Sequence, residues 1–181
     1  MKLERTRLPD VARLVPQVFG DQRGFFMETW NTQKLAEAGL SVRFVQENMS
    51  RSSKGVLRGL HYQIENAQGK LVRALRGRIF DVAVDLRRSS PTFGKWVGEW
   101  LDDEAKRALW VPPGFAHGFY VAEDADVMYA CTEFYAPAHE RSLAYDDPTI
   151  GIEWPLERGA TPSLSGKDAS APTLSAAEVY P

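Results

Sequence analysis

The chain has 181 residues, of which 44% are hydrophobic and 25% charged, and its formal net charge is −2. This balance excludes a polybasic surface for nucleic acid or an anionic membrane, and a single cysteine, Cys131, excludes an intrachain disulfide and a cysteine-based zinc site. No apolar run approaches the ~20 residues of a membrane span, and the N-terminal stretch MKLERTRLPD lacks the apolar core of a signal peptide. We therefore expect a cytoplasmic protein with one domain over residues 1–181 and with no nucleic-acid or membrane partner.

Short strand-like segments follow one another along most of the chain. Every second residue from Phe80 to Leu86 is a large hydrophobic one, with Asp81 and Asp85 between them, which predicts a strand with one buried face. Gly77 and the stretches RSSP and EDAD predict turns. The predicted strands cover residues 24–30, 42–50, 56–64, 71–77, 79–87, 95–101, 107–112, 118–123 and 127–135.

One helix is expected in NTQKLAEAGL, with Asn31 as its N-cap and Gly39 as its C-cap. Because no second long helical pattern precedes the C-terminal region, the spacing favours an all-β sandwich or jelly roll over a βαβ sheet. The region after about residue 136 is rich in Pro, Gly and Ser, a composition typical of a loose surface tail. The alternation from Ile150 to Leu156, however, favours packing of this tail against the sheet.

Two polar residues interrupt the predicted strand VLRGLHYQ. A histidine in a strand is more often structural than catalytic, and in a regular strand Arg58 would point away from the face that carries His61. Gly59 between them can mark a β-bulge that brings both side chains to one face. A guanidinium in a core is costly unless it binds an anion, so the pair indicates an anion-binding strand with a histidine beside it.

The stretch PPGFAHGF contains Pro112-x-Gly114-x-x-His117 and resembles the second sequence motif of the cupin superfamily, a turn that places a histidine in the mouth of a barrel. Metal-binding cupins use a His-x-His pair, but here Tyr62 and Gln63 follow His61. A 2-His-1-carboxylate site with His61 and His117 stays open as an alternative. The preferred interpretation is a metal-free barrel with a histidine base.

Two further features have both structural and functional readings. Tyr129 and Tyr135 are six residues apart, so on one strand they would share a face, as core aromatics or as a proton donor facing a base. Lys167 and Asp168 lie in a polar stretch that is normally exposed to solvent. If the tail folds back over the barrel mouth, Asp168 can orient a histidine and stabilise its charge.

Together these stretches resemble the dTDP-4-dehydrorhamnose 3,5-epimerase family. The resemblance runs nearly from end to end and rests on VFGDQRGFFMETWN, FVQENMSRSSKGVLRGLHYQ, NAQGKLVRALRGRIFDVAVDLRRSSPTFGKWVG, LWVPPGFAHGF, DDPTIGIEWP and LSGKDASAP. It implies a cupin-type jelly-roll barrel, all-β, with one or a few short helices and a C-terminal tail packed back on the barrel. It also implies a homodimer paired through N-terminal strands.

The resemblance further implies an enzyme that uses neither cofactor nor metal. Its substrate would be dTDP-4-dehydro-6-deoxy-D-glucose, whose C4 ketone acidifies the protons on C3 and C5, and inversion at both carbons would give dTDP-4-dehydro-L-rhamnose. By the resemblance, His61 is the base, with Asp168 as its partner. Lys70 stabilises the enolate oxygen, and Tyr129 returns the proton from the opposite face.

The binding residues that the resemblance implies lie along the whole chain. Tyr135 would stack on the thymine ring, Arg58 would contact the diphosphate, and Arg23 and Glu28 would reach a neighbouring subunit's site. The remaining expected substrate contacts are Gln46, Glu47, Asn48, His117, Glu140 and Lys167. Met49, where the family commonly has histidine, and Cys131, at a variable position, are departures that leave the exact substrate preference open.

Three other interpretations compete with this one. A mono-epimerase acting at C3 or C5 alone would share the same base and acid. A metal-dependent cupin oxygenase or isomerase would need the ligands that the missing His-x-His pair does not supply. A sugar-nucleotide binding protein without activity would keep the binding residues and lose the proton transfer.

Overall fold

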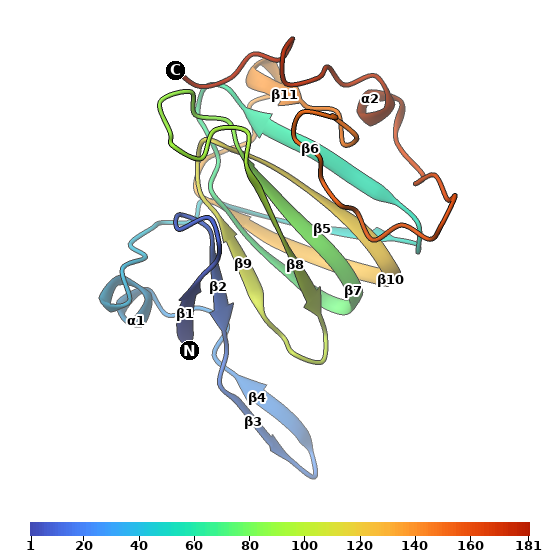
Figure 1. Ribbon diagram of the computed structural model, residues 1–181. Coiled ribbons are helices and arrows are strands. Elements are labelled where there is room, and N and C mark those ends of the chain that lie inside the picture. The colour runs from blue at the N-terminus through green and yellow to red at the C-terminus, as the bar shows by residue number, and fades with distance from the viewer.

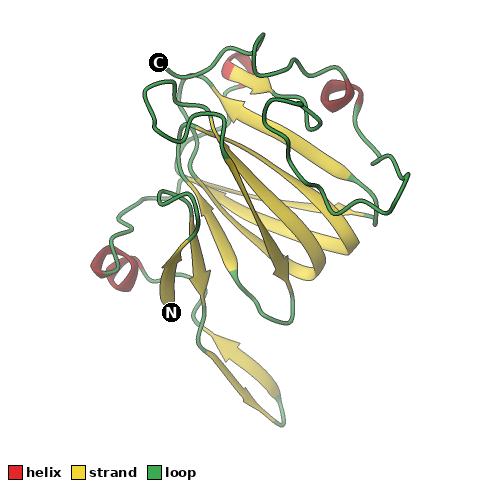
Figure 2. Ribbon diagram, in the orientation of Figure 1, coloured by secondary structure: helices red, strands yellow, loops and turns green.

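The computed structural model describes residues 1–181 as an all-β fold with little helix, which Figure 2 shows by its predominance of strand. The elements in chain order are β1 Lys2–Arg5, β2 Ala12–Val15, β3 Val18–Asp21, β4 Gly24–Met27, α1 Thr32–Glu37, β5 Gln46–Ser52, β6 Leu57–Gln63, β7 Lys70–Asp85, β8 Trp96–Asp102, β9 Ala108–Val111, β10 Phe115–Cys131, the 3-10 turn η1 Pro137–His139, β11 Glu140–Ser142 and α2 Gly166–Ala169. The expected all-β class is confirmed. Neither short α-helix of this fold could span a lipid bilayer.

Two long antiparallel strands, β7 and β10, pair along most of their length and belong to both layers of the barrel (Figure 1). In one layer the first part of β7 pairs with β9 and the last part of β10 pairs with β5. In the other layer the second part of β7 pairs with β8 and the first part of β10 pairs with β6. This arrangement is the jelly roll that the sequence predicted.

The predicted turns at Gly77 and at EDAD are wrong, because both stretches lie inside β7 and β10 as bends. The pairing of the two strands shifts register between Val121 and Val127, opposite the bend at Gly77. Gly77 has φ +73°, and a Cβ there would collide with the carbonyl oxygen of Asp124. The turn residues therefore mark the place where both strands pass from one layer to the other, as bulges do in curved sheets.

The alternation in β7 is confirmed, but its polar face is not exposed. Val82 and Val84 of the apolar face pack beneath the C-terminal segment, in one cluster with Leu143 and Ile150. The other face points into the barrel, so both Asp81 and Asp85 are fully buried. The strand is therefore covered on both sides, and each carboxylate needs a partner inside.

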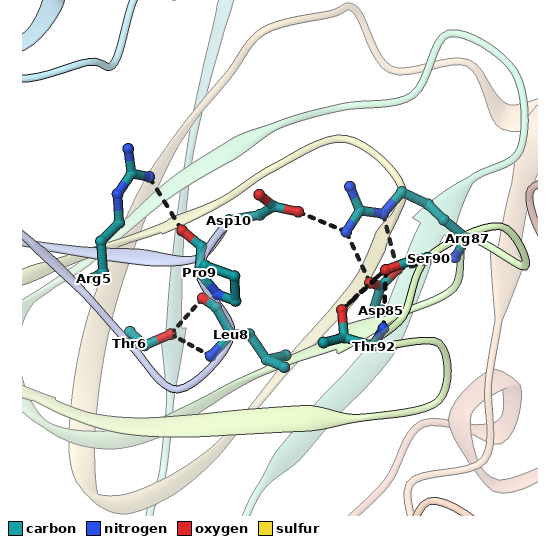
Figure 3. A network of polar contacts seen from close by, with 9 residues as sticks. All are labelled: Arg5, Thr6, Leu8, Pro9, Asp10, Asp85, Arg87, Ser90 and Thr92. Atoms are coloured by element: carbon teal, nitrogen blue, oxygen red, sulfur yellow. Dashed lines mark hydrogen bonds and ion pairs between the residues drawn. The ribbon is translucent and has the colours of Figure 1, made fainter.

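Asp85 finds its partners in the loop that follows β7 (Figure 3). Its oxygens accept hydrogen bonds from the Arg87 backbone and guanidinium and from the hydroxyls of Ser90 and Thr92, at 2.6–3.0 Å. Arg87 also donates to Asp10 at 2.7 Å, which ties this loop to the segment between β1 and β2. Although burial opposes ionisation, the bonds from Arg87 and the two hydroxyls lower the pKa of Asp85 to about 2.

The C-terminal segment packs back on the barrel, as expected, and α2 lies beside β6 (Figure 1). The indole nitrogen of Trp154 donates to the carbonyl of Tyr145 at 2.8 Å, and Ile152 and Trp154 pack against the β7 cluster. The apolar alternation in the tail was therefore a better guide than its composition. The predicted helix is confirmed for Thr32–Glu37, with Asn31 as the N-cap whose side chain accepts from the Lys34 N–H. The predicted C-cap is wrong by one residue, because Ala38 caps the helix and Gly39 follows it at positive φ.

The hairpin β3–β4 projects away from the barrel (Figure 1). Its hydrophobic side chains Val18, Phe19, Phe25 and Phe26 are all exposed, with Phe26 70% accessible. Arg23 lies in its turn and is bound only to Asp21 of the same hairpin. Such a concentration of exposed aromatic surface on a two-stranded hairpin is typical of a protein interface.

Candidate active site

The barrel holds a cavity of about 580 Å³ between its layers. Strands β5, β6, β7 and β10 supply its walls, and residues 163–168 of the tail close one side. Ten of the expected site residues line it: Gln46, Asn48, Arg58, His61, Lys70, His117, Tyr129, Tyr135, Glu140 and Asp168. Residues from six separate stretches of sequence thus meet in one place.

The β-bulge predicted at Gly59 is confirmed. On β10, His117 pairs with His61 and Phe119 pairs with Arg58, so Gly59 and Leu60 together oppose Gly118 alone. Gly59 has φ +118°, and a Cβ there would lie 2.6 Å from the Gly118 Cα. Only glycine fits this position, and the extra residue turns Arg58 and His61 onto the same cavity.

His61 and Asp168 form a hydrogen-bonded pair, with 2.6 Å between Nε2 and Oδ1. Asp168 is 4% exposed, and its N–H donates to the side chain of Ser165, the N-cap of α2. Burial lowers the pKa of His61, while the Asp168 carboxylate partly raises it again, so the neutral ring is favoured near pH 7. With Nε2–H held by Asp168, the lone pair of Nδ1 is free for a proton, which is the arrangement of a general base.

Lys70 and Tyr129 also line the cavity. Lys70 is almost fully buried and its ammonium forms no hydrogen bond or ion pair within the chain, so it is free to bind a group in the cavity. Burial lowers the pKa of Lys70, and burial raises the pKa of Tyr129, which keeps the phenol protonated. The cavity therefore brings together a base, a phenolic acid and a cation.

A polar cluster forms at the mouth of the cavity. Glu140 accepts from the Tyr135 hydroxyl at 2.9 Å and pairs with the Lys167 ammonium at 2.6 Å. Although burial alone would raise it, these two donors lower the pKa of Glu140. Gln46 accepts from the Tyr135 backbone N–H, which fixes the loop after β10. Tyr135 lies in this loop, so the prediction that it shares a strand with Tyr129 is wrong, although both line the cavity.

Some expected site residues do not reach the cavity of their own chain. Arg23 lies on the projecting hairpin, and Glu28 binds Asn31 and Lys34 beside α1. Glu47 alternates with Gln46 and Asn48 along β5 and faces a separate pocket of about 390 Å³. Lys167 reaches the site only through Glu140. Met49, one of the departures, is exposed, since it lies on the same outward face as Glu47.

The alternative of a 2-His-1-carboxylate metal site lacks a set of ligands in the structure. No group of three or more His, Cys, Asp or Glu side chains is arranged to hold a metal ion. His61 and His117 are neighbours across β6 and β10, but no carboxylate converges with both of them. The donor atoms in the cavity therefore do not fit a 2-His-1-carboxylate site.

One buried group escaped the sequence analysis. Asp81 lies behind His117, with 2.7 Å between Oδ1 and Nε2, and it is fully buried. The strand pattern places Asp81 opposite an apolar face, and a polar residue in that position predicts exposure to solvent. The available signal was that the apolar tail would cover one face of β7 and leave the other to the barrel interior.

Comparison with known proteins identifies the family of this chain. The sequence model described as dTDP-4-dehydrorhamnose 3,5-epimerase matches residues 5–176. The chain belongs to the dTDP-4-dehydrorhamnose 3,5-epimerase family. The family's member from Pseudomonas aeruginosa is 55% identical over 183 residues, which cover 100% of both chains.

Solved structures of this family share the fold over nearly the whole chain. The 3,5-epimerase of Legionella pneumophila in complex with dTDP-4-keto-L-rhamnose superposes with a TM-score of 0.93 at 50% identity and covers 98% of this chain and 94% of its own. The 3′-monoepimerase ChmJ of Streptomyces bikiniensis in complex with dTDP-quinovose gives a TM-score of 0.87 at 35% identity, covering 95% and 87%. The epimerase family therefore includes relatives with one and with two inverted centres.

Proposed function

We propose that the protein inverts C3 and C5 of dTDP-4-dehydro-6-deoxy-D-glucose and forms dTDP-4-dehydro-L-rhamnose. The observation that carries this proposal is the His61–Asp168 pair in one cavity with Lys70 and Tyr129. Family membership and the 55% identical relative of the same description support the substrate.

The proposed reaction uses each of these groups once per inverted carbon. Nδ1 of His61 takes the proton from C3 or C5, and the electron pair of the broken C–H bond forms the enolate with its charge on the C4 oxygen. Asp168 stabilises the imidazolium at 2.6 Å. The ammonium of Lys70 stabilises the enolate oxygen. The Tyr129 hydroxyl then gives its proton to the opposite face of the carbon, and solvent restores both groups.

The remaining cavity residues are proposed to hold the nucleotide. Arg58 is the guanidinium beside the cavity and suits the diphosphate. Tyr135 is proposed to stack on the thymine ring, since it is exposed at the mouth and anchored through Glu140 and Gln46. Gln46, Asn48, His117, Glu140 and Lys167 are proposed as further contacts, whereas the outward position of Glu47 argues against direct contact within its own chain.

We further propose a homodimer in which the β3–β4 hairpin of one chain packs on the other. Exposed Phe19, Phe25 and Phe26 supply the apolar surface that such a contact would bury. Arg23 would then reach the partner's cavity with Glu28 behind it. Sedimentation that finds only monomer at micromolar concentration would contradict this. A single domain over residues 1–181 and a cytoplasmic location stay predictions.

The test of the proposed function is exchange in D₂O. The protein is incubated with dTDP-4-dehydro-6-deoxy-D-glucose, and deuterium is located by NMR and mass spectrometry. Label at both C3 and C5, with inversion at both, is expected. Label at one carbon would favour the mono-epimerase alternative. A protein that binds the nucleotide but gives no label at either carbon would be a binding protein, and the proposal would be wrong.

A further inference from the structure

A second imidazole–carboxylate pair lies directly beside the first. His117 and His61 are opposite each other on β10 and β6, and each ring binds a carboxylate through Nε2. The two pairs differ in burial: the side chain of His61 is 32% exposed, and that of His117 is 7% exposed above a fully buried Asp81. A solvent-exposed base exchanges protons readily, whereas the buried pair is better suited to a fixed charge distribution.

The buried pair leaves one nitrogen open to the cavity. Nδ1 of His117 has no hydrogen-bond partner in the chain, yet it is not among the polar atoms sealed from solvent, and His117 lines the cavity. The ammonium of Lys70, also free and also lining the cavity, is close enough to Asp81 to influence its ionisation. Nδ1 of His117 and the ammonium of Lys70 therefore both belong to residues that line the cavity, and neither has a hydrogen-bond partner from the chain.

The charge of the pair decides whether Nδ1 donates or accepts. A net negative pair is costly in a buried site, the more so because Oδ2 of Asp81 has no hydrogen-bond partner. Burial raises the pKa of Asp81, which favours a pair that keeps one additional proton. If that proton is on Asp81, the carboxyl donates to Nε2 and the single proton of the neutral ring lies on Nδ1. If it is on the ring, the imidazolium has a proton on both nitrogens, so Nδ1 is a donor in either case.

We propose that Asp81 is a positioning residue that holds His117 with a protonated Nδ1 facing the cavity, so that His117 and Lys70 together form a two-donor site for the C4 oxygen as it becomes negative. The proposal rests on the proposed function for its substrate. It gives the enolate oxygen a second N–H donor, and both donor residues are buried, so their hydrogen bonds to developing charge are stronger than in water.

A double-mutant cycle tests whether Asp81 acts through His117. Asp81→Asn keeps the shape of the side chain but cannot neutralise an imidazolium, and we expect kcat to fall roughly 10- to 100-fold with KM nearly unchanged. In a His117→Gln background the same substitution is expected to change kcat less than about threefold. Equal losses in both backgrounds would overturn the proposal. Unchanged affinity for dTDP would show that the nucleotide site is intact.

The tautomer of His117 gives a readout that needs no turnover. The chain has three histidines, so the ring ¹⁵N signals can be assigned with His→Gln variants. In the wild-type protein between pH 6 and 8 we expect Nδ1 of His117 to carry a proton, and in Asp81→Asn we expect this population to fall. An unprotonated Nδ1 in the wild type would overturn the inference even if Asp81→Asn fails to fold. Absence of D₂O exchange would instead count against the proposed function, while the tautomer would still test the position of the ring.

Discussion

Asp168→Asn is the sharpest test of the base. The substitution keeps the size of the side chain and an oxygen that can accept from Nε2 of His61, but it removes the negative charge 2.6 Å from the ring. Proton abstraction creates a positive charge on His61 in the transition state, so the lost charge affects kcat more than ground-state binding.

The magnitude follows from the separation and the surroundings. Two unit charges about 4 Å apart interact by about 4 kcal/mol at an effective dielectric constant of about 20. Because the His61 side chain is 32% exposed, solvent screening reduces this value. A loss of about 2–4 kcal/mol of transition-state stabilisation corresponds to a kcat lower by roughly 30- to 1000-fold.

The pH dependence of kcat/KM gives the direction of the expected shift. His61 acts as a base only when neutral, so kcat/KM falls as the pH drops through its pKa, which burial holds below 6.5. Since the Asp168 carboxylate raises the pKa of His61, Asp168→Asn is expected to move this acid limb to lower pH while lowering the plateau. The assay is the initial rate of deuterium incorporation between pH 4 and 9, with circular dichroism as the check on folding.

Asp146→Asn is the matched control, since Asp146 is an exposed aspartate of the same C-terminal segment and is expected to leave kcat unchanged. If kcat of Asp168→Asn falls by less than about threefold, the reasoning from charge is refuted. Solvent screening at a ring that is 32% exposed cannot reduce an interaction of about 4 kcal/mol to so small an effect. A shift of the acid limb to higher pH would refute it as well.

Three further predictions concern the bulge, the buried carboxylate and the acid. Gly59→Ala is expected to lower the unfolding free energy, measured in urea, by about 2–5 kcal/mol. Gly55 is also at positive φ but has open space where a Cβ would lie, so Gly55→Ala should cost about 1 kcal/mol. Similar losses in the two variants would contradict the role of the contact with Gly118. The pKa of Asp85 is about 2 in the folded state against 3.8 unfolded, so its stabilisation is complete above pH 4 and is lost as the pH falls toward 2, by about 2 kcal/mol. Asp85→Asn should therefore be less stable at pH 6 and show a shallower acid decline, and parallel curves would contradict this. Tyr129→Phe should retain deuterium exchange but lose inversion, raising the ratio of exchange to inversion at least about tenfold, and an unchanged ratio would assign the acid elsewhere.

The all-β class followed from local pattern alone, since alternation along β7 and the absence of helical periodicity are properties of short stretches. The positions of the turns could not be predicted from local pattern, because residues such as Gly77 and EDAD occur both where a chain reverses and where a long strand bends. What decides between the two is the contact of Gly77 with Asp124, which lies on another strand and leaves no local mark. The burial of Asp81 was missed for the same reason: only the packed tail shows that both faces of β7 are covered.

More of the candidate site than of the detailed strand geometry could be predicted from the sequence. The Arg58-Gly59-Leu60-His61 stretch contained enough chemistry to predict the bulge, because glycine is required where a guanidinium and an imidazole must share a face. Asp168 has no local signal of its own that it joins the cavity. The apolar alternation from Ile150 to Leu156 favoured a tail packed on the sheet, and the resemblance made Asp168 the partner of His61. The outward position of Glu47 follows from strand alternation beside Gln46 and Asn48, a pattern that the sequence itself contains.

The His61–Asp168 pair joins residues 107 positions apart in the chain. Both long strands of the barrel lie between those two positions, so no short piece of the chain contains the imidazole and its carboxylate together. The carboxylate belongs to the C-terminal tail, where α2 packs beside β6. A substitution that loosens α2 from β6 would therefore weaken the base from a distance, although it touches none of the strand pairs that carry Lys70 and Tyr129.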